Sequence, residues 1–434
     1  MRENQLIVYR NLEEGGLFFG MARLMRVYGE EALPLEERVS LLYRCAGELL
    51  ETTGQHGFYG NLWHCYLANL LVNNENIYSR ACEMRGEAGG SINGAVLHDM
   101  AIFKEFFDYD FGPMMECLKA SELIALFCYE SCEEGSRVYN TRIRGRVCEL
   151  AVKLGQAADP IEMKAALSDF YREYGVGKLG LHKAFRIVRE DGGMEILPIL
   201  NIAHVRLDDL VGYELPKQKL IQNTEAFVSG GKANNCLLFG DAGTGKSSCI
   251  KAIANAYYDR GLRLIEVYKH QFRELHEVIG RIKNRNYKFI IYMDDLSFEE
   301  FETEYKYLKA VIEGGLEKKP DNVLIYATSN RRHLIKETFA DKEGRRDQLH
   351  AGDTVQEKLS LASRFGVTIF FGAPDQKQFQ EIVRTLAERN GILMPKEELL
   401  LEANRWELSH GGLSGRTAQQ FVDYLSGKER DSKL

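Results

Sequence analysis

Residues 240–247 carry the most specific chemical pattern of the chain, Gly-Asp-Ala-Gly-Thr-Gly-Lys-Ser. The run matches the phosphate-loop pattern G-x-x-x-x-G-K-[ST] at every constrained position. Its glycines allow the left-handed backbone that turns main-chain N–H groups toward an anion. We expect Lys246 to place a positive charge on the β- and γ-phosphates of a nucleotide, and the hydroxyl of Ser247 to ligate Mg²⁺. The predicted phosphate contacts are Gly240, Asp241, Ala242, Gly243, Thr244, Gly245, Lys246, Ser247 and Ser248.

Two carboxylates follow an apolar run further along the chain. Residues 289–293 read Phe-Ile-Ile-Tyr-Met and lead into Asp294 and Asp295, which resembles a Walker B motif. Because ligands of parallel sheets bind at the carboxyl ends of the strands, we expect these acids beside the phosphate loop. We predict that Asp294 holds the Mg²⁺, directly or through a water, and that Asp295 activates a water molecule. The alternative is a turn or a helix cap, which the phosphate loop upstream disfavours.

The next apolar run, residues 323–328, leads into Ser329 and Asn330. The amide of Asn330 could hold an attacking water or sense the γ-phosphate. Ser-Asn after a strand is also ordinary turn chemistry. The run by itself does not decide between these two interpretations.

These groups must be positioned by strands and helices, and the apolar pattern predicts them. An apolar strand precedes the phosphate loop, and a helix over 246–257 follows it with its positive end toward the phosphates. From about residue 204, strands alternate with helices, which indicates a parallel sheet with crossover helices. The five predicted strands are 235–239, 263–267, 289–294, 322–328 and 367–371.

The regions on either side of this sheet are predicted to be helical. Residues 1–200 carry apolar positions at helical spacing, with one short strand candidate at 195–200 after a glycine-containing turn. After Pro374, three helical segments are predicted to form a small lid. We therefore predict three domains: a mostly helical domain at 1–200, a possible adaptor; a nucleotide-binding α/β core at 201–373; and a helical lid at 374–434.

Composition limits the class of protein. The 434 residues, 45% of them hydrophobic, suit two or three globular domains. No apolar run approaches the ~18 residues of a membrane span, and the first residues do not read as a secretory signal, so we expect a cytoplasmic protein without membrane contact. Nine cysteines without C-x-x-C spacing predict reduced thiols and no structural metal. The net charge of −7 argues against a surface built to bind nucleic acid.

Together, these motifs resemble those of the AAA+ ATPases, a superfamily of P-loop NTPases. The phosphate loop, the two aspartates and residues 327–331 occur in the order and spacing of that superfamily, with Asn330 in the place of its sensor 1. Over about residues 205–427 the chain is similar to one bacterial AAA+ family, catalogued as domain of unknown function 815. The stretches that carry this likeness are 207–214, 245–248, 294–299 and 414–421.

Two arginines extend the resemblance. Arg364 lies in a Ser-Arg-Phe-Gly segment similar to the one that carries the AAA+ arginine finger, and Arg416 lies in a segment similar to sensor 2. The resemblance implies that Arg364 reaches the nucleotide of a neighbouring copy, and hence a homo-oligomer. It implies that Arg416 contacts the nucleotide of its own subunit. It further implies that the segment of Val211, Gly212 and Tyr213 lines the adenine pocket.

The resemblance implies an ATPase that turns ATP and water into ADP and phosphate. ATP is also favoured because no Asn-Lys or Thr-Lys dipeptide occurs, so the guanine-reading motif of GTPases is absent from the sequence. Most AAA+ ATPases have glutamate where this chain has Asp295, and the shorter side chain predicts slow hydrolysis. Asp295 could act through a bridging water, or Glu299 could assist.

Three functions from different classes remain at this stage. The favoured one is an ATPase that changes shape to remodel or regulate an unidentified protein partner. The second is a loader-type ATPase associated with nucleic acid; basic residues at 281–288 invite it, but a solvated helix face explains them more simply. The third is a non-hydrolysing ATP-dependent switch or scaffold, which the aspartate at 295 suggests. A peptide-threading motor is disfavoured because no glycine follows the aromatic residues at 268–272 in the expected pattern.

Overall fold

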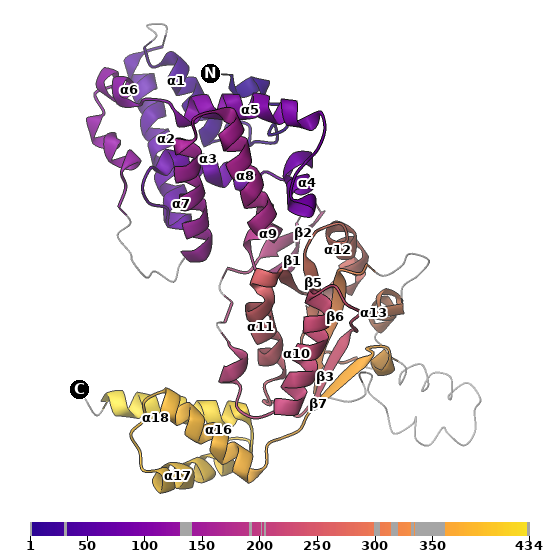
Figure 1. Cartoon of the computed structure of the whole chain (residues 1–434). Helices are drawn as coiled ribbons and strands as arrows, with labels where there is room; N and C mark the ends of the chain where they lie inside the picture. Colours follow the sequence, from indigo (N-terminus) through magenta and orange to yellow (C-terminus); the bar gives the residue numbers. More distant parts are fainter. Residues whose placement is uncertain are drawn as a thin grey trace. The chain divides into compact units, whose positions relative to one another are not determined.

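The computed structural model describes residues 2–29, 33–130, 141–190, 193–200, 202–203, 205–298, 304–313, 320–330, 334 and 361–431. The chain divides into two compact units, Met1–His182 and Lys183–Leu434 (Figure 1). Within the described part of the chain, no helix combines the length and the apolar character needed to cross a membrane.

The first unit is built from helices around one hydrophobic core. Its buried side chains include Trp63, Phe103 and Tyr171, and a carboxylate at its centre, Asp99, accepts hydrogen bonds from the backbone N–H groups of residues 7–9. The elements are η1 (Glu3–Gln5), α1 (Leu17–Val27), α2 (Leu35–His56), α3 (Leu62–Asn73), α4 (Ile77–Arg85), α5 (Ile92–Phe107), α6 (Gly112–Cys117), η2 (Ser121–Phe127), α7 (Thr141–Gln156), α8 (Pro160–Tyr174) and α9 (Gly177–Leu181).

The second unit contains a seven-stranded sheet in the order β2-β1-β4-β5-β6-β3-β7. Every pairing of neighbours is parallel except that of β1 with β2. The strands are β1 (Ala184–Glu190), β2 (Gly193–Pro198), β3 (Cys236–Gly240), β4 (Leu262–Glu266), β5 (Lys288–Met293), β6 (Val323–Ser329) and β7 (Val367–Phe371). The α/β class and the mostly parallel sheet expected from the sequence are thus confirmed.

The predicted number of five strands was wrong. The two additional strands, β1 and β2, form an antiparallel hairpin that joins the sheet by pairing β1 with β4. The sequence suggested only one strand in this region and no pairing with the sheet. Charged residues interrupt β1, and Arg186 and Arg189 are exposed, so the strand lacks the continuous apolar run typical of the inner strands.

The helices of the second unit cover the sheet. Leu220 of α10 (Glu214–Val228) and Ile250 and Ile253 of α11 (Lys246–Tyr257) share one hydrophobic core with alternate residues of the strands. The other alternate residues of β5, such as Phe289 and Ile291, are buried as well, so both faces of this strand are covered. The remaining elements of the α/β part are η3 (Leu207–Asp209), η4 (Tyr258–Arg260), η5 (Lys269–Glu274), α12 (Leu275–Ile282) and α13 (Glu304–Glu313).

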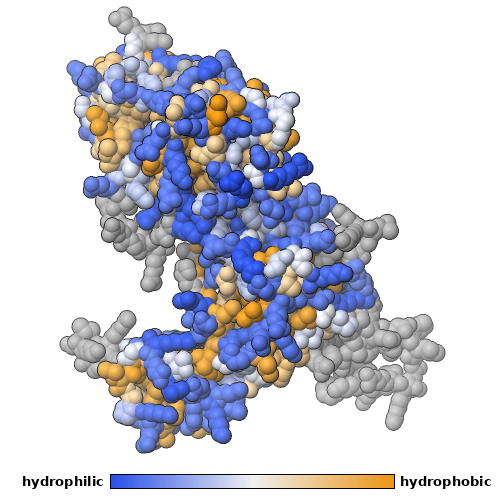
Figure 2. Space-filling view, viewed as in Figure 1, coloured by the Kyte–Doolittle hydropathy of each residue, from blue (hydrophilic) through white to orange (hydrophobic). Residues whose placement is uncertain are grey.

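Three helices after β7 form the lid: α16 (Gln376–Arg389), α17 (Lys396–Ser409) and α18 (Gly415–Asp431). Asp375 begins α16 with a capping box, since its carboxylate accepts from the N–H of Gln378. Phe379, Phe421 and neighbouring apolar residues form a separate core. Figure 2 shows hydrophobic residues at the visible surface of the lid. The exposed large apolar side chains of this region are Leu393, Leu401, Leu408 and Tyr424.

The phosphate loop starts where β3 passes between β6 and β7. Gly240 has a φ of 135°, and a Cβ added to it would lie 2.1 Å from the carbonyl oxygen of Phe371 on β7. The next N–H, that of Asp241, donates to the same carbonyl at 2.9 Å. Glycine is therefore required at 240 by its backbone and by its close approach to β7.

We predict that Gly240→Ala lowers the free energy of unfolding by about 3 kcal/mol, because it adds a steric clash to a strained backbone. Gly261→Ala is the matched control: Gly261 has a φ of 86°, but a Cβ added to it would meet no neighbouring atom within 4 Å. Its cost should be about 1 kcal/mol. Urea unfolding of both variants checks this, and equal losses would contradict the clash.

Candidate nucleotide-binding site

The phosphate loop joins β3 to the first turn of α11. Gly243 and Gly245 have φ values of 73° and 87°, and α11 begins at Lys246, directly after them. The hydroxyl of Thr244 donates to the carbonyl of Asp241 at 2.8 Å, which closes the loop on itself. The unpaired N–H groups at the start of a helix bind anions, so this loop presents a phosphate site.

Lys246 is held at this loop by three acceptors. Its Nζ donates to the carbonyl oxygens of Gly240 at 3.0 Å and Asp241 at 2.6 Å, and to Oδ1 of Asn330 at 3.1 Å. Burial lowers the pKa of the Lys246 ammonium, although the neighbouring carboxylate of Asp241 acts in the opposite direction. A buried cation with only partial compensation is suited to bind an anion.

Asp294 connects the helix after the phosphate loop to the neighbouring strand. Its Oδ1 accepts from the hydroxyl of Ser247 at 2.7 Å and from that of Thr328 at 2.6 Å. Burial raises the pKa of Asp294, but the hydrogen bonds from Thr328 and Ser247 outweigh it, and the pKa lies below its usual value. An ionised carboxylate beside a serine hydroxyl provides the oxygen ligands that Mg²⁺ prefers, so these residues fit the metal.

Asp295 has a left-handed backbone with a φ of 49°. Its N–H donates to the hydroxyl of Thr328 at 2.9 Å, and its Oδ1 accepts from the amide of Asn330 at 2.8 Å. Aspartate and asparagine adopt this conformation more readily than other residues except glycine. The backbone thus gives a physical reason for aspartate at this position, and Asn330 connects its carboxylate to the ammonium of Lys246.

These groups line one cavity of about 620 Å³ between the phosphate loop and the lid, a size typical of small-molecule sites. Its polar part includes Lys246, Ser247, Asp294, Asp295, Asn330 and Arg416, which the sequence predicted as site residues. The other predicted residues in the lining are Ala242, Gly243, Thr244, Gly245, Ser248, Val211 and Tyr213. The apolar part consists of Leu210, Val211, Ile382 and Leu386.

Three predicted contacts lie just behind the lining. Gly240 and Asp241 turn their carbonyl oxygens to Lys246, and Gly212 lies between two lining residues without being one itself. Arg416 contacts the phosphate loop from the lid, since its main-chain N–H donates to the carbonyl of Gly243 at 3.3 Å.

Arg364 is not among the residues that line the cavity. Its Nη2 lies 2.6 Å from Oε1 of Glu313, at the end of α13. The predicted role of Arg364 in a neighbouring copy stays a prediction. Glu299, which could assist Asp295, lies outside the described residues.

Sequence reasoning missed several residues of the site. Thr328 was part of the recognised segment but received no role, although a hydroxyl at the end of a strand beside two aspartates is a usable signal. Ile382 and Leu386 lie in a predicted helix of the lid, and the sequence assigned them no part in the site. The missed lining residues are Asp209, Leu210, Cys249, Thr328, Ile382, Leu386, Gly415, Gln419 and Gln420.

We predict that Thr328→Val lowers the free energy of unfolding by about 2 kcal/mol, because it removes a donor from the Asp294 carboxylate and leaves the N–H of Asp295 without its acceptor. Thr328→Ser keeps the hydroxyl and serves as the control. Urea unfolding of the two variants measures the difference. A Val variant as stable as the Ser variant would show that the hydroxyl does not stabilise this arrangement.

Comparisons with known proteins give a family model and several solved structures. No curated protein matches the chain. Solved structures that match include Thermotoga maritima RuvB, described as a Holliday junction branch migration motor, at 14% identity and a TM-score of 0.35 over 51% of this chain and 64% of that one. An alanine variant of the same RuvB matches at 14% identity and a TM-score of 0.35, over 50% and 63% of the two chains.

The chain thus spans less than two thirds of each of these two RuvB structures. A family model described as "Protein of unknown function (DUF815)" matches residues 181–429, which include the whole sheet, the cavity and nearly all of the lid. This match extends over more than half of the 434 residues. The chain therefore belongs to the DUF815 family, as the motifs of its sequence predicted.

Proposed function

We propose that this protein binds ATP together with Mg²⁺ in the cavity, hydrolyses it to ADP and phosphate, and uses the lid to pass the resulting change of shape to a protein partner. One observation carries the proposal. The phosphate loop, two strand-end aspartates, Asn330 and a lid arginine, Arg416, line the same cavity. Phosphoryl transfer depends mainly on positioning and on charge stabilisation, and these residues supply both.

The phosphates would be held by the first turn of α11 and by Lys246. The carbonyls of Gly240 and Asp241 keep the Lys246 ammonium at the mouth of the loop, so little side-chain freedom is lost when an anion binds. Ser247 and Asp294 would hold Mg²⁺, which when bound supplies positive charge to the phosphate oxygens.

Asp295 is the group best suited to accept a proton from an attacking water. Its carboxylate is oriented by the amide of Asn330 at 2.8 Å, and a carboxylate in a fixed orientation is an effective general base. Arg416 lines the cavity from α18 and provides a second positive charge beside the loop.

The apolar part of the cavity fits the adenine base. Leu210 and Val211 come from the segment before α10, and Ile382 and Leu386 come from α16 of the lid. A flat aromatic base is bound favourably by such apolar walls. One of these walls belongs to the α/β part and the other to the lid. A bound base would contact both parts, so its binding would depend on the angle of the lid.

A second candidate is a non-hydrolysing ATP-dependent switch. It is favoured by the aspartate at 295, whose side chain is one methylene shorter than the usual glutamate. For the ATPase, we further propose a homo-oligomer in which Arg364 of one copy acts on the nucleotide of the next, as the AAA+ resemblance implies.

Lys246→Ala tests the binding site. We expect the variant to bind ATP weaker by about two orders of magnitude or more, because it loses the charge-assisted contact to the phosphates. Calorimetry with ATP and Mg²⁺ measures this. Lys219→Ala, which removes an exposed lysine of α10, is the control and should bind as the wild type does. Equal affinity of both variants would place the nucleotide elsewhere.

Asp295→Asn tests hydrolysis and separates the two candidates. Asparagine tolerates the left-handed backbone and keeps an acceptor for Asn330 but not the basic carboxylate, so ATP binding should persist while turnover falls by about 10²-fold or more. Release of phosphate and calorimetry measure the two quantities. Wild-type protein that binds ATP but does not turn it over, whether alone or in its assembled form, would favour the switch instead.

A further inference from the structure

One face of the lid helix α16 lines the cavity and, further along the helix, makes a second contact with the α/β part. Ile382, Leu386 and Arg389 follow each other at spacings of four and three residues, so they lie along one face of the helix. The first two line the apolar part of the cavity. Arg389, in the last turn of α16, extends beyond them to the short helix η3 before α10.

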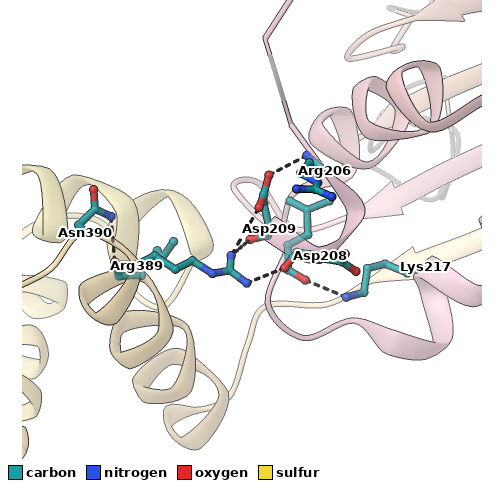
Figure 3. A network of polar contacts seen from close by, with 8 residues as sticks. Arg206, Asp208, Asp209, Lys217, Arg389 and Asn390 are labelled. Carbon is teal, nitrogen blue, oxygen red and sulfur yellow. Dashed lines mark hydrogen bonds and ion pairs between the residues drawn. The ribbon is translucent and has the colours of Figure 1, made fainter. Parts of the chain in front are cut away.

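There the guanidinium of Arg389 binds two consecutive main-chain carbonyls. Nη1 donates to the carbonyl oxygen of Asp209 at 2.9 Å, and Nη2 donates to that of Asp208 at 2.6 Å (Figure 3). Both residues belong to the short helix η3, whose last carbonyls have no partner within so short a turn. Two parallel bonds from one planar group fix orientation as well as distance.

The side chain of Asp209 contributes little to this contact. Its Oδ1 lies 3.9 Å from Nη1 of Arg389, and both side chains are partly exposed, which makes a weak ion pair. Its Oδ2 instead accepts from the N–H of Arg206 at 2.7 Å and caps the turn. The contact of Arg389 is therefore chiefly with the backbone.

The segment that Arg389 holds provides one wall of the cavity. Leu210 and Val211 directly follow the two carbonyls. Leu210 is tied to the α/β part, because its carbonyl accepts from Lys217 at 2.8 Å and its side chain packs on the core there. Val211 packs on the core of the lid. The segment thus lies between the two parts, and Arg389 is its polar connection to the lid.

We propose that Arg389 is a positioning residue that fixes the nucleoside end of the cavity by holding the backbone of residues 208–209 to the lid. This inference rests on the proposed function, since it assigns a nucleoside to the apolar walls. Arg389 does not touch the cavity. It acts through Leu210 and Val211, whose position against Ile382 and Leu386 sets the width of the apolar slot.

The test compares Arg389→Ala with Arg384→Ala. Arg384 is a partly exposed arginine of the same helix whose ion pairs, to Glu381 and Glu388, stay within α16. Amide hydrogen exchange of the nucleotide-free protein measures directly whether Arg389 holds the backbone of residues 208–209. We expect exchange at 208–211 to become about fivefold faster or more in Arg389→Ala and to stay unchanged in Arg384→Ala.

The affinities for ATP and for tripolyphosphate then show whether the nucleoside end of the cavity is affected. ATP should bind Arg389→Ala about tenfold weaker, because residues 208–211 must then be ordered as the nucleotide binds. Inorganic tripolyphosphate, which has no nucleoside, should bind as it does to the wild type. Arg389→Lys should fall between wild type and Arg389→Ala, because an ammonium cannot donate in the same fork.

Several results would overturn the proposal. Unchanged exchange at 208–211 would show that Arg389 does not hold the segment. ATP affinity within about twofold of the wild type, or equal weakening of ATP and tripolyphosphate, would show that it does not position the nucleoside end. Failure of the proposed function is distinguishable, because it would be seen in the wild-type protein as a lack of ATP binding.

Discussion

The site depends on one pair of hydrogen bonds, which Ser247 and Thr328 donate to the same carboxylate oxygen of Asp294. One oxygen of this carboxylate accepts from Ser247 at the start of α11 and from Thr328 at the end of β6. A buried charge must be compensated by donors, so the three elements can pack at this edge of the sheet only in an arrangement that keeps both hydroxyls in place. The same Thr328 hydroxyl accepts from the N–H of Asp295, and thereby sets the path of the chain after β5. The proposed metal ligands and the proposed base are thus positioned by one buried threonine.

The aspartate at 295 is better understood from its backbone than from its side-chain length alone. Its φ of 49° lies in a region that aspartate and asparagine enter most readily among the residues with a side chain. The chain reaches this conformation at the point where it leaves β5, and the carboxylate then meets the amide of Asn330. Asn330 also accepts from Lys246, so the proposed base and the proposed phosphate-binding cation share one amide. An anion that draws Lys246 toward itself would therefore alter the surroundings of Asp295 through a single side chain, and would connect the proposed nucleotide binding to the proposed hydrolysis.

The motifs that lie at the ends of strands were readable from the sequence, and contacts across the fold were not. The phosphate loop, Asp294 and Asn330 follow apolar runs, and parallel strands bring such ends to one edge of a sheet. Strand β1 was missed because its exposed arginines break the apolar run, although pairing with β4 places it in the sheet. Thr328 received no role because its importance depends on two partners far away in sequence. Arg389 lies in an ordinary helix terminus, and only the structure brings it to backbone carbonyls some 180 residues earlier.

The lid touches the α/β part at both ends of the cavity, and this restricts how it can move. At the phosphate end, the N–H of Arg416 donates to Gly243, and a Cβ at Gly243 would lie 3.0 Å from Ser414 Oγ and 3.2 Å from Arg416 Cβ. At the other end, Arg389 holds the backbone of residues 208–209. The stretch of chain between β7 and the lid is held to the α/β part, since the hydroxyl of Tyr213, at the start of α10, donates to the carbonyl of Gly372 at 2.9 Å. A rotation that opens the phosphate end while the Arg389 contact is kept must turn about the nucleoside end. When the contacts of the loop and of Arg416 with a phosphate are lost, the lid would then rotate as one body and would stay attached at the nucleoside end.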